Sequence, residues 1–157
     1  MSLDFICSED TYNYVKKRCM DEGCRLKIGK GLVCHYVFDI EKYVKDNYPE
    51  KKTTDCLIIC IWKEHKIIAV IELKNNSFDV DKIKHKFESI FEIVGDFIDV
   101  NSLNEYLKVP ILLSKSLNGE YTKILDRTKI DIDDKKYPII KEKCNSSLTT
   151  ILKNYYD

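Results

Sequence analysis

Two isoleucine- and valine-rich runs, 57–62 and 67–73, constrain the fold of this chain more than any other feature. A short polar interruption, Lys63 to Lys66, separates them, so the pattern predicts two strands joined by a tight turn. Each run is too short to span a membrane. Because both runs are almost continuously apolar, neither strand has a water-facing side, and we expect helices to cover both faces of a central sheet.

Three charged residues interrupt this apolar background at the strand ends. Asp55 precedes the first strand, whereas Glu72 and Lys74 end the second. Side chains repeat with period two along a strand, so Glu72 and Lys74 share a face. A turn of two or four residues pairs positions whose numbers have an odd sum, which places Asp55 on that face too. A three-residue turn without a bulge would place it on the opposite face.

Two carboxylates at one end of a hairpin require a neutralising partner. Neighbouring Asp and Glu side chains repel each other, and one takes up a proton unless a cation lies between them. Mg²⁺ suits such a pair, because it binds one or two carboxylates, several waters and substrate phosphate oxygens. Lys74 is placed to polarise an attacking water and to balance charge that develops on a phosphate. Asp55, Glu72 and Lys74 therefore predict phosphodiester hydrolysis.

These residues resemble the motif of the PD-(D/E)XK nuclease superfamily, which has the restriction-endonuclease-like fold. The motif elements are Thr54-Asp55 and, after a strand's length, Glu72-Leu73-Lys74. The likeness covers the central third of the chain, including the helix expected after it. It departs from the family pattern at Thr54, where the signature has proline. An isolated E-x-K carries little information, and the upstream Asp, the two strands and the following helix make the match more specific.

The resemblance implies a role for each matching residue. Asp55 and Glu72 would bind Mg²⁺, or Mn²⁺, with the Leu73 carbonyl as a further ligand. Lys74 would be the catalytic lysine. In the family an N-terminal helix often supplies one more acidic residue, and Glu9 and Glu22 are the candidates for that position. For Glu9, a surface glutamate favoured by the helix dipole is the preferred interpretation.

The helix expected after the motif, from Asp79 to about Phe97, carries one apolar and one basic face. The basic face includes Lys82, His85 and Lys86 near the start of the helix. A phosphate backbone passing the carboxylate site would meet these side chains. A solvated helix surface accounts for the same charges, so both interpretations stay open.

Composition and length restrict the remaining possibilities. With 157 residues, the chain is expected to form a single domain, 1–157. Its 26 basic and 26 acidic residues balance, so nucleic-acid binding would depend on local clustering of lysines. Neither a signal peptide nor a transmembrane run is recognisable in the sequence, and we expect a cytoplasmic protein without a membrane partner.

The seven cysteines are expected to be reduced, because nothing in the sequence indicates secretion. Cys7, Cys19, Cys24 and Cys34 with His35 include residue types that bind zinc or iron–sulfur clusters. Their spacing matches no standard ligand pair, so we interpret the cysteines as small apolar residues of the core.

The rest of the chain predicts ordinary elements. These are a first helix up to about Asp21, a hairpin around Gly29-Lys30-Gly31, a helix over 39–48, a strand at 110–113, a turn at Asn118-Gly119 with an edge strand over 121–125, a charged loop over 129–136 and a final helix after Ser146.

We therefore expect an α/β domain with a restriction-endonuclease-like three-layer fold, in which helices cover both faces of a mixed sheet of about five strands. The predicted function is Mg²⁺-dependent hydrolysis of phosphodiester bonds in DNA, with RNA a less favoured substrate. A homodimer would allow both strands of a duplex to be cut. The alternative is a non-catalytic module that keeps this fold and binds a protein or a nucleic acid.

Overall fold

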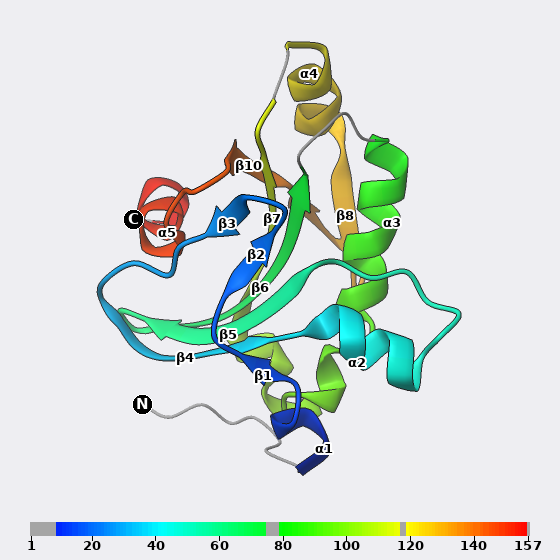
Figure 1. Cartoon of the computed structure of the whole chain (residues 1–157), viewed down its shortest axis with the longest axis vertical. Coiled ribbons are helices and arrows are strands. Elements are labelled where there is room, and N and C mark those ends of the chain that lie inside the picture. Colours follow the sequence, from blue (N-terminus) through cyan, green and yellow to red (C-terminus); the bar gives the residue numbers. More distant parts are fainter. Residues whose placement is uncertain (1–8, 75–78, 117–118, 157) are drawn as a thin grey trace.

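The computed structural model describes residues 9–74, 79–116 and 119–156. A mixed six-stranded sheet in the order β1-β4-β5-β6-β7-β10 forms its centre, which confirms the α/β class (Figure 1). Its strands are β1 (Val15–Lys16), β4 (Leu32–Phe38), β5 (Cys56–Trp62), β6 (His65–Lys74), β7 (Tyr106–Ser114) and β10 (Ile140–Lys143). The pairs β1–β4, β4–β5 and β5–β6 are antiparallel, and the pairs β6–β7 and β7–β10 are parallel.

Strands β5 and β6 form the predicted hairpin around a two-residue turn. Trp62 pairs with His65, and Cys56 pairs with Ile71, so paired residue numbers sum to 127 throughout the ladder. Lys63 in the turn has a φ of 53°, a conformation that tight hairpin turns require. Every residue of β5 and residues 67–73 of β6 are buried. The prediction of a central hairpin covered on both faces is confirmed.

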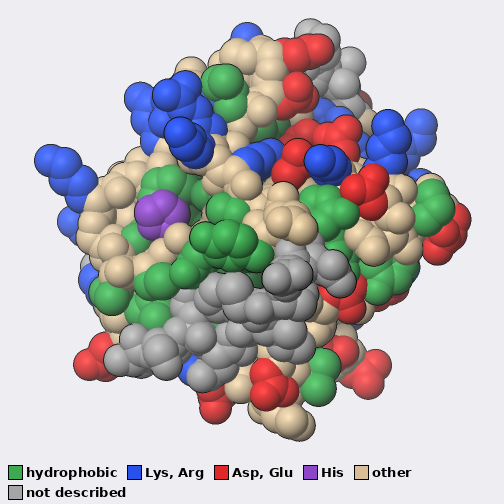
Figure 2. All heavy atoms as spheres, turned by 60° about the horizontal axis from the view of Figure 1, so that its bottom comes forward, with side chains coloured by type: hydrophobic (Ala, Val, Ile, Leu, Met, Phe, Trp, Pro, Cys, Tyr) green, Lys and Arg blue, Asp and Glu red, His purple; other side chains and the backbone are tan. Residues whose placement is uncertain are grey.

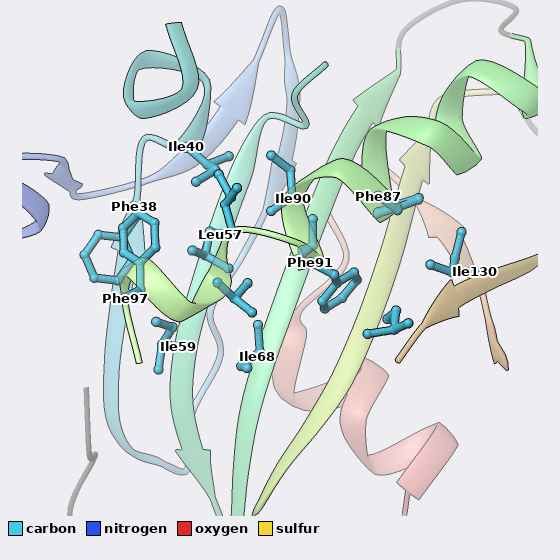
Figure 3. Close-up of a cluster of buried hydrophobic side chains, with 14 of the residues drawn as sticks. Phe38, Ile40, Leu57, Ile59, Ile68, Phe87, Ile90, Phe91, Phe97 and Ile130 are labelled. Carbon is cyan, nitrogen blue, oxygen red and sulfur yellow. The ribbon is translucent and has the colours of Figure 1, made fainter. Parts of the chain in front are cut away.

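Two hydrophobic clusters lie on opposite faces of the sheet. One face is covered by α2 (Ile40–Asn47), α3 (Val80–Phe91) and the short 3-10 helices η1 (Val94–Asp96) and η2 (Val100–Glu105). Figure 3 shows Phe87, Ile90 and Phe91 of α3 directed toward the strands on this side. The other face is covered by α5 (Leu148–Tyr156) and by a hairpin of β2 (Cys19–Asp21) and β3 (Cys24–Leu26).

Helix α3 begins where the sequence predicts. The Asp79 side chain accepts hydrogen bonds from the backbone N–H groups of Asp81 and Lys82, which caps the first turn. The helix ends at Phe91, earlier than expected, and a 3-10 turn follows it. Its apolar side packs on the sheet, while Lys82 and His85 are exposed and Lys86 is partly buried.

The N-terminal prediction is wrong in its secondary structure. Helix α1 (Glu9–Tyr12) has only four residues, and the segment predicted to be helical continues into β1 and β2. Strand β2 pairs with β3, so the predicted hairpin around Gly29-Lys30-Gly31 does not form between β3 and β4. Gly23, at φ 82°, sits in the β2–β3 turn. Pairing and burial of Cys19 outweigh the weak helical spacing of this segment.

Two predictions near the C-terminus are also wrong. Residues Gly119–Arg127 form helix α4 where an edge strand was expected, and Asn118 lies outside the described residues. The expected charged loop is a hairpin of β8 (Lys129–Ile132) and β9 (Lys135–Pro138). Buried Ile130 and Ile132 alternate with exposed neighbours in β8, a period-two pattern that the surrounding charges obscure.

Two disulfides join the β2–β3 hairpin to the rest of the protein. Cys19 is bonded to Cys56 of β5, and Cys24 is bonded to Cys144 after β10. The expectation of reduced cysteines is therefore wrong. The hairpin packs on the sheet and brings the two cysteines of each pair together. The Cα atoms of Cys19 and Cys56, 37 positions apart in the chain, lie 5.9 Å from each other, and those of Cys24 and Cys144, 120 positions apart, lie 4.9 Å from each other. Among the described residues, Cys34 and Cys60 are free.

The surface is mixed in character. On the face shown in Figure 2, hydrophobic side chains gather near the centre, with acidic and basic side chains interspersed around them. Of the helices in the described part of the chain, none has the length and apolar character to cross a membrane.

Candidate active site

Asp55, Glu72 and Lys74 converge as the hairpin register predicts. The backbone N–H of Asp55 donates to the carbonyl of Ile71 at 3.0 Å, which extends the β5–β6 ladder to the residue before β5. Asp55 therefore lies across the ladder from Glu72, on the α3 side of the sheet. Both carboxylates and Lys74 line one cavity of about 710 Å³.

The Asp55 carboxylate is held in place but is costly to ionise. Its Oδ2 accepts a hydrogen bond from the backbone N–H of Leu73 at 2.7 Å. Burial raises the pKa of Asp55 to about 7, and a hydrogen bond to Glu72 and the charge of Glu72 add to the rise, against the opposing effects of Leu73 N–H and Lys74. Near neutral pH and without a cation, Asp55 is therefore protonated in a large fraction of molecules.

Glu72 is 2% exposed and is flanked by two ammonium groups. Lys86 Nζ lies 2.8 Å from Glu72 Oε2, and Lys74 Nζ lies 3.5 Å from the same oxygen. Burial alone would lower the pKa of Lys86, but its hydrogen bond to Glu72 and the Glu72 charge raise it. The buried carboxylate thus has an internal counter-ion that reaches it from α3.

The three basic residues predicted to contact nucleic acid lie in different places. Lys86 lines the cavity and pairs with Glu72, a contact that the sequence did not reveal. Lys82 is exposed and lines the cavity. His85 does not line it, and its Nδ1 lies 3.6 Å from Glu88 Oε1. Glu9 begins α1, but its side chain lies outside the part of the structure that is described.

Sequence analysis missed two further carboxylates of the cavity, Glu41 of α2 and Asp21. Asp21 lies at the end of β2, in the segment predicted to be helical. Burial raises the pKa of Asp21, and the charge of Asp55 is the next cause of the rise, so the two side chains interact. The Cys19–Cys56 disulfide joins β2 to the residue after Asp55. No local sequence signal could have found Asp21, because this hairpin docks through tertiary contacts.

The segment before β5 completes the rim of the cavity. It supplies Lys51, Lys52, Thr53 and Thr54, and α3 supplies Lys82. Thr54, the residue at the proline position of the resembled motif, is 1% exposed. Within the described residues, its Oγ1 has no hydrogen-bond partner. Lys51 is paired with Glu92 at 2.6 Å, whereas Lys52 is exposed.

The donor set fits a divalent cation that keeps most of its coordination for water and substrate. Asp55 and Glu72 supply two carboxylates, the number that Mg²⁺ uses together with waters and phosphate oxygens. The raised pKa of Asp55 is the electrostatic cost of placing it beside Glu72 without a cation. Within the described residues, no three or more His, Cys, Asp or Glu side chains are grouped so that they could hold a metal by themselves.

No protein-family model, curated protein or solved structure matches this chain. The likeness to PD-(D/E)XK nucleases therefore rests on the motif residues Thr54-Asp55 and Glu72-Leu73-Lys74.

Proposed function

We propose that this protein is a Mg²⁺-dependent nuclease that hydrolyses phosphodiester bonds in DNA and has a restriction-endonuclease-like fold. The observation that carries the proposal is the convergence of Asp55, Glu72 and Lys74 in one cavity, at the end of a hairpin whose buried residues are otherwise apolar. A buried pair of carboxylates is expensive to maintain, and a catalytic cation is a physical reason to keep it.

Each residue of the cavity has a defined part in the proposal. Asp55 and Glu72 hold Mg²⁺ or Mn²⁺, with the Leu73 carbonyl as a further ligand. The ion, when bound, supplies a Lewis acid for the phosphate and a means to activate water. Lys74 orients the attacking water and stabilises charge that develops on the phosphate. Lys86 neutralises Glu72 in the metal-free protein and is available to phosphate once a cation takes its place.

The rim of the cavity supports a phosphodiester substrate. Lys51, Lys52 and Lys82 line the cavity together with Glu41 and Asp21. Five lysines thus gather here against four acidic residues, in a chain that has no net charge. Such lysines bind phosphates without reading sequence. Preference for DNA over RNA follows from the resembled family, as does a homodimer for cutting both strands of a duplex.

The compartment belongs to the proposal as well. Cytoplasmic placement was expected together with reduced cysteines. The two disulfides favour an oxidising environment instead, because reducing compartments normally keep protein thiols free.

A non-catalytic binding module is the second candidate, and one observation favours it. Lys86 already balances Glu72 at 2.8 Å, so the carboxylate is neutralised without any metal. A module of this kind would bind nucleic acid or protein through the lysine rim and would perform no hydrolysis.

A cleavage and binding experiment distinguishes the two functions. Supercoiled, linear and single-stranded DNA and an RNA of the same sequence are incubated with Mg²⁺, Mn²⁺ or EDTA. We expect metal-dependent cleavage that Lys74→Ala abolishes while DNA affinity is retained, because Lys74 acts mainly in the transition state. Lys82→Ala is the matched control and should weaken binding. Wild-type protein that binds DNA without cutting it under any condition would establish the binding module.

A further inference from the structure

A second cavity, of about 420 Å³, lies at the other end of β7 from the candidate active site. Glu72 pairs with Leu112 of β7, whereas the second cavity begins at Tyr106, about 20 Å away along the strand. Its lining residues are Asn104, Tyr106, Leu107, Lys108, Lys135, Tyr137, Pro138, Ile140, Tyr155 and Tyr156. None of these residues is acidic, and none takes part in the proposed nuclease site.

The cavity exists because β10 covers only half of β7. Strand β10 pairs with β7 from Ile111 to Ser114, so the edge of β7 from Tyr106 to Val109 extends beyond it. Strand β9 packs on one side of this open edge through Tyr137. The C-terminal end of α5 packs on the other side through Tyr156. The opening is thus walled by three elements and is a formed cavity of ligand size.

Lys108 is a nearly buried cation within this cavity. It is only 8% exposed, and burial lowers its pKa, with Asp133 opposing the decrease and Lys135 adding to it. In the described contacts, its ammonium donates one hydrogen bond, to the Leu103 carbonyl at 3.3 Å. An ammonium has three N–H donors. Asp133 balances part of this positive charge, and an anionic group beside Lys108 and Lys135 would balance more of it.

Tyrosines form the more accessible part of the lining. Tyr155 is 49% exposed, while Tyr137 and Tyr156 are partly buried. Burial raises the pKa of Tyr156, and the electrostatic interaction with Tyr137 adds to the rise. Both rings line the cavity. Tyrosine rings contribute flat apolar contact area, on which a planar base can stack.

We propose that this cavity binds one nucleoside phosphate, with its phosphate beside Lys108 and Lys135 and its base against the tyrosines. The buried lysine matches the phosphate of such a ligand, and the tyrosine rings match its base. A phosphate alone or a base alone would contact only part of the lining. The site does not depend on the nuclease proposal, since its residues are separate. The ligand can be a free nucleotide or the 5′-phosphorylated end of a strand.

Titration of the ¹⁵N-labelled full chain with dAMP in EDTA tests this proposal by NMR. We expect shifts in the amides of 104–108 and 135–140, and roughly tenfold weaker binding of deoxyadenosine and of inorganic phosphate than of dAMP. Lys135→Gln and Tyr155→Ser change exposed side chains, so their folding is preserved, and each should weaken dAMP binding severalfold. Lys82→Gln, at the rim of the first cavity, is the matched control and should leave the affinity for dAMP unchanged.

The results separate the proposal from its rivals. Shifts centred on Asp55, equal affinity for phosphate and dAMP, or unchanged affinity in both cavity variants would each overturn it. Competition of a 5′-phosphorylated oligothymidylate with dAMP would identify a strand end as the ligand, and absence of competition would identify a free nucleotide. The same titration on Lys74→Ala keeps the outcome independent of the nuclease activity.

Discussion

Replacing Asp55 with asparagine should stabilise the metal-free protein while it removes the function. An asparagine can accept the Leu73 N–H through its carbonyl and donate to Glu72 through its amide, as the protonated aspartic acid does. It never becomes charged, so the cost of ionising Asp55 beside Glu72 disappears. The gain in folding stability of Asp55→Asn over wild type should therefore depend on pH.

The sign follows from the raised pKa of Asp55. In the unfolded chain this group titrates near its ordinary value of 3.8, and in the folded protein near 7. The folded state therefore binds the proton more tightly between these values. This contribution to stability is fully present below pH 3.8 and is lost as the pH rises through 7. Asparagine at position 55 carries no such loss.

The magnitude comes from the same two values. A difference of about three pKa units corresponds to about 4 kcal/mol at the limit. Asp55 keeps some contact with solvent and interacts with Lys74, so we expect about 2 kcal/mol at pH 8. For a chain of 157 residues, that is a rise in Tm of about 4–8 °C. At pH 5 the folded protein holds the proton while the unfolded chain has largely lost it, so the difference should be less than half of that at pH 8.

Thermal unfolding at pH 5 and pH 8 in EDTA, then with Mg²⁺, measures the effect. Mg²⁺ should raise the Tm of wild type by mass action and should not raise that of Asp55→Asn. Asp21→Asn is the matched control, because that carboxylate lines the same cavity and is much less buried. Equal or lower stability of Asp55→Asn at pH 8 would refute the electrostatic argument, and a preserved Mg²⁺ response would place the metal elsewhere.

Three further predictions concern the same region and its supports. Lys86→Met should destabilise the metal-free protein by about 2 kcal/mol, because buried Glu72 loses its nearest cation. The same change should tighten Mg²⁺ binding measured by calorimetry, and weaker Mg²⁺ binding would contradict the counter-ion role of Lys86. Lys74→Ala should lower single-turnover cleavage by at least about 100-fold with little change in DNA affinity, and parallel losses of both would assign Lys74 to binding. Removal of the Cys24–Cys144 disulfide, which spans 120 positions, should cost about 3–5 kcal/mol in denaturant unfolding, and an unchanged midpoint would show that hairpin packing alone suffices.

The sequence by itself determined the central part of this protein. Continuous apolar runs around Lys63-Glu64 specified a buried hairpin, and a turn of two or four residues would put Asp55 on the face of Glu72 and Lys74. The structure has the two-residue turn, in which Asp55 lies across from Glu72. Asp79 specified the start of α3 through a local hydrogen bond to the backbone. These features are set by neighbours in the chain or by a single tight turn, so periodicity and capping rules were sufficient.

Only the tertiary structure decided what surrounds that hairpin. The β2–β3 hairpin, with Asp21 and two half-cystines, gains its stability from docking on the sheet, and its own sequence spacing favoured a helix. Lys86 was recognisable as a basic residue of α3, but its contact with Glu72 depends on how the helix packs over β6. Contacts between segments far apart in the chain leave no periodic signal, and they complete the candidate site.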